Sequence, residues 1–304
     1  MDTSGKRNYI LLPPTLGNKL GTLLISFFVL LIAVALLQPV VSSLCTDQRD
    51  AFLISSSLQC LLAFIAPSLL TAYLCSPSVS EYVGATSDVA PRQFAGVIVL
   101  MIIMLPALNM IVGWNADLQL PEFMSGLEQT FRTWEENAAR TTEMILGDTS
   151  LFGLISGILI VGCLTGLAEE MFFRAGLQKA LTSSGVNHHL AIWTAAFIFS
   201  AVHFQFFGFV PRLLLGGLFG YLYCYTGSIW IAATAHALNN SLVVLSAWLT
   251  ARGAVNVRFD EIGTGGEYGW LFALVSAVLT TGFIIYLWKI FFRRPQQTGA
   301  SAKA

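Results

Sequence analysis

The sequence predicts an all-α protein that crosses a membrane about eight times. Of its 304 residues, 55% are hydrophobic and only 11% are charged, whereas soluble domains carry about 25% charged residues. Apolar runs of about 20 residues, long enough to cross the hydrocarbon core, recur along the chain. No run alternates as a barrel strand does, so helices are the structure that can satisfy the backbone in lipid.

Eight apolar segments are expected to form the membrane helices. In order they are residues 20–41, 51–74, 94–114, 151–181, 188–206, 210–225, 228–250 and 268–292. The first is too long for a cleaved signal peptide, so we expect it to remain as a span. The chain then divides into a cytoplasmic N-terminal segment, three helices, an extracytoplasmic amphipathic helix, a core, a loop with the last helix, and a disordered cytoplasmic tail: residues 1–19, 20–114, 115–150, 151–250, 251–292 and 293–304.

The orientation follows from the positive-inside rule, by which Lys and Arg near span ends collect in the cytoplasm. Basic residues lie near the N-terminal end of the first predicted helix and near the C-terminal end of the last one: Lys6, Arg7, Lys19, Lys289, Arg293, Arg294 and Lys303. An even number of spans places both termini on one side. We therefore expect a multi-pass protein of the cell (inner) membrane with both termini in the cytoplasm and residues 115–150 outside.

The segment 115–150 contains the most soluble-looking sequence of the chain. Apolar or small residues recur in it at helical spacing, with charged residues between them: Leu127, Phe131, Trp134, Ala138 and Thr141. This pattern predicts an amphipathic helix on the outer membrane surface. A plain connector between two spans is the alternative, and the sequence leaves both open.

Charge and cysteine content exclude two classes of function. The net charge is −1, so no basic face exists to neutralise phosphates, and no nucleic-acid partner is expected. The expected partners are membrane lipid and a peptide or membrane-protein substrate. No CxxC pair or disulfide framework is visible. We interpret the five cysteines as buried thiols acting as small hydrophobes: Cys45, Cys60, Cys75, Cys163 and Cys224.

The stretch GLAEEMFFRAGL, residues 166–177, places two glutamates and an arginine inside apolar sequence. A charged side chain at mid-bilayer costs roughly 2.5–3.5 kcal/mol, so Glu169, Glu170 and Arg174 must face the protein interior. Glu170 and Arg174 are four residues apart and share a helix face, which predicts an ion pair. Glu169 points about 100° away from Glu170. It is therefore left free for chemistry, while Glu170 would be structural.

Two further predicted spans carry polar residues: His203 in the fifth, and His236 with Asn240 in the seventh. A single intramembrane His or Asn is usually a hydrogen-bonded contact between helices, but several ionisable groups together indicate a functional site. A carboxylate and an imidazole can deprotonate a water, and a second imidazole with an amide can donate to an oxyanion. Counting from the predicted inner ends places His203 about 20 Å up its helix, deeper than Glu169.

Three short motifs in this order resemble those of a known family. EEMFFR at residues 169–174 resembles its EExxxR motif, FSAVH at 199–203 its FxxxH motif, and HALNN at 236–240 its HxxxN motif. The family is the CAAX protease and bacteriocin-processing group, also called the CPBP or Abi family, which includes the Ras-converting CAAX endopeptidase. The resemblance covers roughly residues 150–250.

The resemblance implies an intramembrane endopeptidase with an eight-helix core. The original substrates of the family are prenylated C-termini, and such substrates are not expected in a bacterial chain. The roles it implies are catalysis by Glu169 and His203, oxyanion binding by His236 and Asn240, and bracing of the fourth helix by Glu170 and Arg174.

No cofactor is required by this scheme, although Glu169, His203 and His236 match a catalytic zinc site with an open fourth position. The sequence favours the metal-free version, because the Asn240 amide is a poor zinc ligand. In addition, the seventh span has no acidic residue to orient His236 through its second nitrogen. The HExxH, GxGD and GxSG motifs of other intramembrane proteases are absent from the sequence.

Two other classes of function are alternatives to a protease. A proton-coupled transporter would use the same Glu and His groups as a relay, but it should show inverted repeats, and the two halves of the sequence are not similar. The second alternative, a non-catalytic membrane scaffold or bacteriocin self-immunity protein, is not excluded by the sequence. Such a protein should tolerate Glu169→Gln.

Overall fold

The computed structural model describes residue 7 and residues 9–254, 262–265 and 267–291. Within these ranges every regular element is a helix, and seven helices are long and apolar enough to cross a membrane. They are Leu16–Leu44, Gln48–Cys75, Pro91–Ala116, Leu151–Thr182, Phe206–Thr226, Ile229–Ala251 and Gly269–Lys289. The predicted all-α, multi-pass membrane fold is confirmed.

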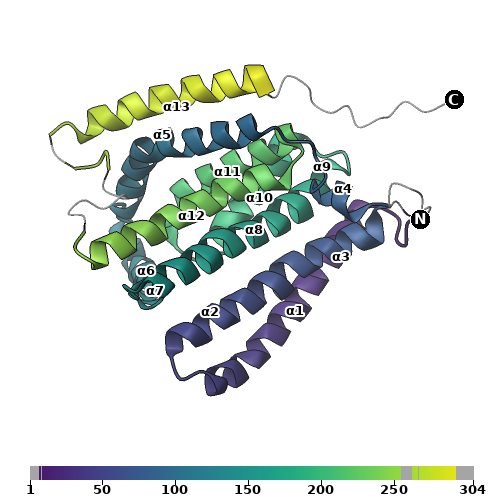
Figure 1. Cartoon of the computed structure of the whole chain (residues 1–304), viewed down its shortest axis with the longest axis horizontal. Helices are drawn as coiled ribbons and strands as arrows, with labels where there is room; N and C mark the ends of the chain where they lie inside the picture. Colours follow the sequence, from purple (N-terminus) through teal and green to yellow (C-terminus); the bar gives the residue numbers. More distant parts are fainter. Residues whose placement is uncertain (1–6, 8, 255–261, 266, 292–304) are drawn as a thin grey trace.

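Five of the spans consist mainly of one α-helix each (Figure 1): α1 (Leu16–Leu44), α5 (Pro91–Ala116), α11 (Phe209–Thr226), α12 (Ile229–Ala251) and α13 (Gly269–Phe291). Two spans contain π-helical turns. The second consists of α2 (Gln48–Leu58), η1 (Gln59–Ile65) and α3 (Ala66–Cys75). The fourth consists of α7 (Leu151–Gly157), η3 (Ile158–Leu164), α8 (Thr165–Glu170), η4 (Met171–Gln178) and α9 (Lys179–Thr182). The remaining elements are α4 (Val79–Val83), η2 (Glu122–Met124), α6 (Ser125–Leu146), α10 (His188–Ala201) and η5 (Phe206–Gly208).

The predicted fifth span is shorter than expected, because α10 has 14 residues and ends at Ala201 instead of 206. Phe204 adopts a left-handed backbone with φ 54°. The backbone of residues that follow it forms hydrogen bonds with a side chain of α5. Asn115 of α5 donates its amide to the Phe206 carbonyl oxygen at 3.3 Å and accepts from the Val210 nitrogen at 2.8 Å. The chain after α10 is thus held by its surroundings and not by continued helix.

α10 still makes one passage through the bundle. In Figure 1 the first residues of α1 and the last residues of α13 lie toward the same end, which requires an even number of passages. Lys19 at the start of α1 donates to the Ser183 hydroxyl at 2.8 Å, so the turn between α9 and α10 lies at this end too. The basic residues Lys6, Arg293, Arg294 and Lys303, with the tail 293–304, lie outside the described residues.

α12 occupies the centre of the bundle. It packs against η3 and α8 on one side and against α11 and α5 on others, while α13 covers α5 and α1 pairs with the second span (Figure 1). Close approach to α8 requires glycine: a Cβ on Gly166 would lie 2.9 Å from the Ala237 backbone nitrogen. Small residues allow this contact, which is how helices associate in lipid.

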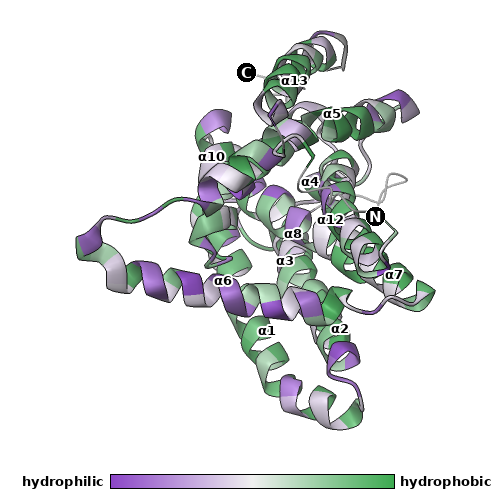
Figure 2. Cartoon of the chain, turned by 90° about the vertical axis from the view of Figure 1, so that its left-hand side faces the viewer, coloured by the Kyte–Doolittle hydropathy of each residue, from purple (hydrophilic) through white to green (hydrophobic). Residues whose placement is uncertain are grey.

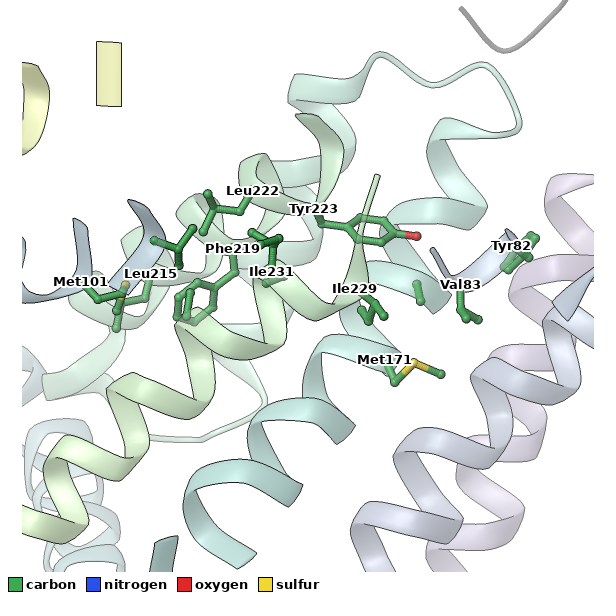
Figure 3. Packing of buried hydrophobic residues seen from close by; sticks show 14 of the residues in the cluster. Tyr82, Val83, Met101, Met171, Leu215, Phe219, Leu222, Tyr223, Ile229 and Ile231 are labelled. Atoms are coloured by element: carbon green, nitrogen blue, oxygen red, sulfur yellow. The ribbon is translucent and has the colours of Figure 1, made fainter. Parts of the chain in front are cut away.

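The core beside the centre is apolar and aromatic (Figure 3). Met171 of η4 contributes to a buried cluster with Phe219 and Tyr223 of α11 and Ile229 and Ile231 of α12. Lipid is as apolar as these side chains, so their packing stabilises the fold through van der Waals contact. This cluster fixes the distance between the helices that carry the polar residues.

α6 is a 22-residue helix that carries many hydrophilic residues and lies across one end of the bundle (Figure 2). It packs on η5, on α2 and on α7. The Phe131 ring stacks on Phe206 at 5.1 Å, and Trp134 meets Phe204 edge-on at 5.9 Å. The apolar positions of α6 therefore contact the segment that follows α10.

The cysteines only partly follow the expectation of buried thiols. All five are free, as predicted, and Cys60 and Cys75 are buried. Cys45 and Cys224 are partly exposed, and Cys163 is exposed on the surface of a membrane-spanning helix. The prediction was wrong for these three. Cys163 and Cys224 belong to apolar helices, which in lipid need not bury their residues within the protein, and Cys45 follows the last residue of α1.

Candidate active site

α8 and the π-helical turn that follows it carry Glu169, Glu170 and Arg174 of the fourth span. Arg174 Nε lies 3.0 Å from Glu170 Oε2, and both side chains are fully buried. The ion pair predicted from the spacing is therefore present. Arg174 also donates Nη2 to the Gly216 carbonyl oxygen at 3.2 Å. π-Helical turns are frequent at functional sites, and two of them, η3 and η4, flank α8.

His236 of α12 joins the two glutamates. Its Nδ1 lies 2.9 Å from Glu170 Oε1, and its Nε2 lies 3.5 Å from Glu169 Oε2. The imidazole stacks on Phe219 with ring centroids 4.9 Å apart. Two expectations need correction here. Glu170 does more than pair with Arg174, and the acidic residue that orients His236 comes from α8, because Gly166 lets α8 approach α12.

His203 lies just beyond α10. Its Nδ1 is 2.7 Å from the Phe199 carbonyl oxygen, and its Nε2 is 4.0 Å from Glu169 Oε1. The expectation that His203 lies deeper than Glu169 was wrong. Both residues lie at similar separations along the chain from the turn at residues 183–187, so antiparallel packing of η4 and α10 brings them to one level.

Asn240 lies one turn beyond His236 on the same face of α12, but its amide is engaged elsewhere. Its Nδ2 donates to the Val161 carbonyl oxygen of η3 at 3.3 Å, and its Oδ1 accepts from Asn239 at 3.3 Å. The structure thus brings Glu169, His203 and His236 together within 4.0 Å. Asn240 belongs to the contact between α12 and η3.

The proposed zinc ligands do not fit a metal ion in this arrangement. Zinc needs its nitrogen ligands at about 2.0–2.1 Å from one point, whereas the two imidazoles approach different oxygens of the Glu169 carboxylate. Across the described ranges, no group of three or more His, Cys, Asp or Glu side chains is arranged to hold a metal ion.

Comparison with known proteins finds the same part of the chain. Residues 151–242, from the start of α7 into α12, match a family model described as Type II CAAX prenyl endopeptidase Rce1-like. This region is similar to the Rce1-like family. The Rce1-like region contains all the predicted site residues, and at the level of the family it supports an intramembrane protease.

A curated relative is similar to part of the chain. The uncharacterized protein YpbD of Bacillus subtilis (strain 168) is 34% identical over 112 residues, which make up 36% of this chain and 49% of YpbD. The chain thus matches about half the length of that relative. No solved structure matches the chain.

Two residues near the site were missed from the sequence. Arg212 of α11 interacts electrostatically with Glu169 and with His203. It stands in the apolar stretch FVPRLLLGG, so the signal that singled out Arg174 could have found it too. Glu135 of α6 accepts hydrogen bonds from the Phe207 backbone nitrogen at 2.9 Å and from the Gln205 amide at 3.4 Å. Glu135 lies in a segment rich in charges, so no sequence signal set it apart.

Proposed function

We propose that the chain is an intramembrane endopeptidase of the CAAX protease and bacteriocin-processing type, which hydrolyses peptide bonds with a water activated by Glu169 and His203. The observation that carries the proposal is the position of one carboxylate between two imidazoles, with separations of 4.0 Å to His203 and 3.5 Å to His236. Such a group within a membrane span is costly and indicates function.

Hydrogen bonding around His203 supports its proposed role. The Phe199 carbonyl oxygen can only accept a hydrogen bond, so the Nδ1 atom of His203 carries the proton and the Nε2 atom presents a lone pair. Glu169 Oε1, 4.0 Å from Nε2, is an acceptor as well. Two acceptors at this separation suit one water that donates a hydrogen to each. Its oxygen then has a free lone pair for attack.

In the proposed reaction, the water oxygen bonds to the carbonyl carbon of the peptide while its proton passes to Glu169. The carbonyl oxygen takes up the negative charge. When the tetrahedral intermediate collapses, the C–N bond breaks and the proton on Glu169 passes to the leaving nitrogen. The products are a new carboxyl terminus and a new amine.

His236 and Asn240 remain the proposed donors to the oxyanion. Glu170 accepts a hydrogen bond from Nδ1 of His236 at 2.9 Å, which fixes the direction of Nε2. Nε2 can donate to the oxyanion when the ring carries a proton on both nitrogens. Asn240 would exchange its 3.3 Å bond to the Val161 carbonyl for one to the substrate. The proposed setting is the inner membrane, with both termini in the cytoplasm and with a peptide or membrane-protein substrate.

The test is hydrolysis in isotopically labelled water. The purified protein in detergent is incubated in H2(18)O with a mixture of synthetic peptides, half of them prenylated on a cysteine near the C-terminus. Mass spectrometry then follows the products. The wild type should produce new carboxyl termini that carry one (18)O, and Glu169→Gln should produce none. Glu136→Gln, at an exposed glutamate of α6, is the matched control. Equal cleavage by wild type and Glu169→Gln, or no cleavage of either peptide class by the wild type, would contradict the proposal.

A further inference from the structure

Arg212 lies in the first turn of α11, and its guanidinium does not use all of its hydrogen-bond donors. Its Nη2 donates to Gln205 Oε1 at 2.8 Å, but its Nη1 is buried without a hydrogen-bond partner among the described residues. A guanidinium has five N–H donors, and leaving a buried donor unsatisfied costs free energy. A membrane protein that keeps such a group is expected to use it.

The guanidinium of Arg212 contacts the segment that follows His203, because its Nη2 donates to Gln205 Oε1 at 2.8 Å. Its charge interacts with Glu169 and with His203. Gly208 leaves the space that the guanidinium fills, because a Cβ at this position would lie 3.1 Å from Arg212 Nη2. The free N–H groups are thus held against residues 205–208, just after His203, and within electrostatic range of Glu169.

α6 orients the side chain that holds Arg212. Glu135 accepts a hydrogen bond from the Gln205 Nε2 atom at 3.4 Å, so the opposite atom of that amide, Oε1, is turned to Arg212. Glu135 also accepts from the Phe207 backbone nitrogen at 2.9 Å, which fixes the segment between Gln205 and Gly208. A chain of hydrogen bonds therefore runs from the surface helix to the guanidinium.

Most of the other donors near the site already have partners in this structure, although Arg174 Nη1, like Arg212 Nη1, is buried without a hydrogen-bond partner among the described residues. The Asn240 amide donates to the Val161 carbonyl oxygen. Both nitrogens of His236 face carboxylate oxygens, at 2.9 Å from Glu170 and 3.5 Å from Glu169. An oxyanion needs donors that are free and preorganised. Nη1 of Arg212 meets this requirement.

We propose that Arg212 is a further catalytic residue, which donates a hydrogen bond from Nη1 to the scissile carbonyl oxygen as that oxygen gains negative charge. The inference rests on the proposed hydrolysis. Arg212 transfers no proton, because the water's proton goes to Glu169 and then to the leaving nitrogen. Glu135 and Gln205 are positioning residues, because they act only through Arg212.

The kinetic test uses the peptide that the wild type cleaves fastest. Removing one oxyanion donor typically lowers kcat roughly 100- to 1,000-fold, so we expect this loss in Arg212→Met. KM should stay nearly unchanged, since the interaction forms only in the transition state. Arg212→Lys keeps the charge and should recover part of kcat, and Gly208→Ala should lower kcat by displacing Nη2. Arg140→Met, at an exposed arginine of α6, is the control. A wild-type kcat in Arg212→Met, or a change in KM alone, would overturn the inference.

Two further measurements separate catalysis from folding and from the proposed hydrolysis. The melting temperature of Arg212→Met in detergent should equal or exceed that of the wild type, because an unsatisfied buried charge has been removed; a clear decrease would mark Arg212 as structural. Phenylphosphonate, a tetrahedral anion, should raise the melting temperature of wild type and of Glu169→Gln but not of Arg212→Met. If the wild type cleaves no peptide, the proposed function and the catalytic role of Arg212 fail together, whereas the anion test still decides whether Arg212 binds a tetrahedral anion. Equal shifts in all three proteins, or none, would overturn it.

Discussion

Two arginines, the buried Arg49 and the half-buried Arg212, are treated very differently by the fold. Arg49 of α2 donates to the carbonyl oxygens of Ile145 and Gly153 at 2.9 and 3.2 Å and to the Ser156 hydroxyl at 2.8 Å. It also lies 3.6 Å from Asp148. This arginine ties α2 to the ends of α6 and α7, and all of its bonds are within the protein.

Arg212, by contrast, makes one side-chain hydrogen bond and leaves a buried nitrogen without a partner in the described part of the chain. Around it, Glu169 meets His203 at 4.0 Å, beyond hydrogen-bond distance. The comparison indicates that Arg49 is used for structure and that the free donor of Arg212 is available for chemistry, although Arg174 of the structural ion pair also keeps one unpartnered nitrogen, Nη1, in the described part of the chain. The predictions below test this distinction, beginning with the largest expected loss of stability.

The largest loss is expected for Glu170→Ala. The substitution leaves Arg174 fully buried without its carboxylate, which typically costs about 3–5 kcal/mol. It also releases Nδ1 of His236, so activity per folded molecule should fall as well. Thermal unfolding in detergent measures the first effect and peptide cleavage the second. Glu170→Gln, which keeps the size and an acceptor, should be milder in both. Wild-type stability in Glu170→Ala would break the assignment of this pair to the structural class.

Arg49→Met should be the next most destabilising change. It leaves the Ile145 and Gly153 carbonyl oxygens with unmet hydrogen bonds, a cost of about 1–3 kcal/mol. Cleavage per folded molecule should stay unchanged, because this cluster is separate from the Glu169 site. The measurement is a melting curve together with an activity assay normalised to folded protein. Lost activity at wild-type stability would show that satisfied clusters also serve catalysis here.

Gly166→Ala should have a smaller effect on stability and a clear one on activity. The added methyl would lie 2.9 Å from the Ala237 backbone nitrogen, so α12 must shift, and overpacking of this kind costs about 1–3 kcal/mol. The shift moves His236 away from Glu169. Gly113→Ala, where a Cβ meets no atom within 4 Å, is the control. If both variants behave alike, the close contact between α8 and α12 does not position the site.

Ser125→Cys should leave stability unchanged and test the proposed orientation. Ser125 is exposed at the start of α6. A membrane-impermeant maleimide should label this variant in intact cells more strongly than the wild type, whose own cysteines give the background. Labelling that appears only after the membrane is disrupted would place α6 in the cytoplasm.

Much of the fold could be predicted because lipid restricts it so strongly. Hydropathy alone located the long spans, and the four-residue spacing of Glu170 and Arg174 predicted their ion pair. The early end of α10 could not be predicted, since it depends on contacts of residues 204–208 with Asn115 and Glu135, which are distant in the sequence. For the same reason the bond between His236 and Glu170 was missed, because it requires two helices to pack at Gly166.

The most direct test of the account is a paired measurement on Glu169→Gln. The account predicts a melting temperature equal to that of the wild type, because the Glu169 carboxylate is not part of the ion pair that holds the fold. It also predicts no incorporation of (18)O into peptide products, because a neutral amide cannot take the water's proton. A variant that still cleaves peptides, or one that loses activity only because it unfolds, would contradict the claim that Glu169 is kept in the membrane for chemistry.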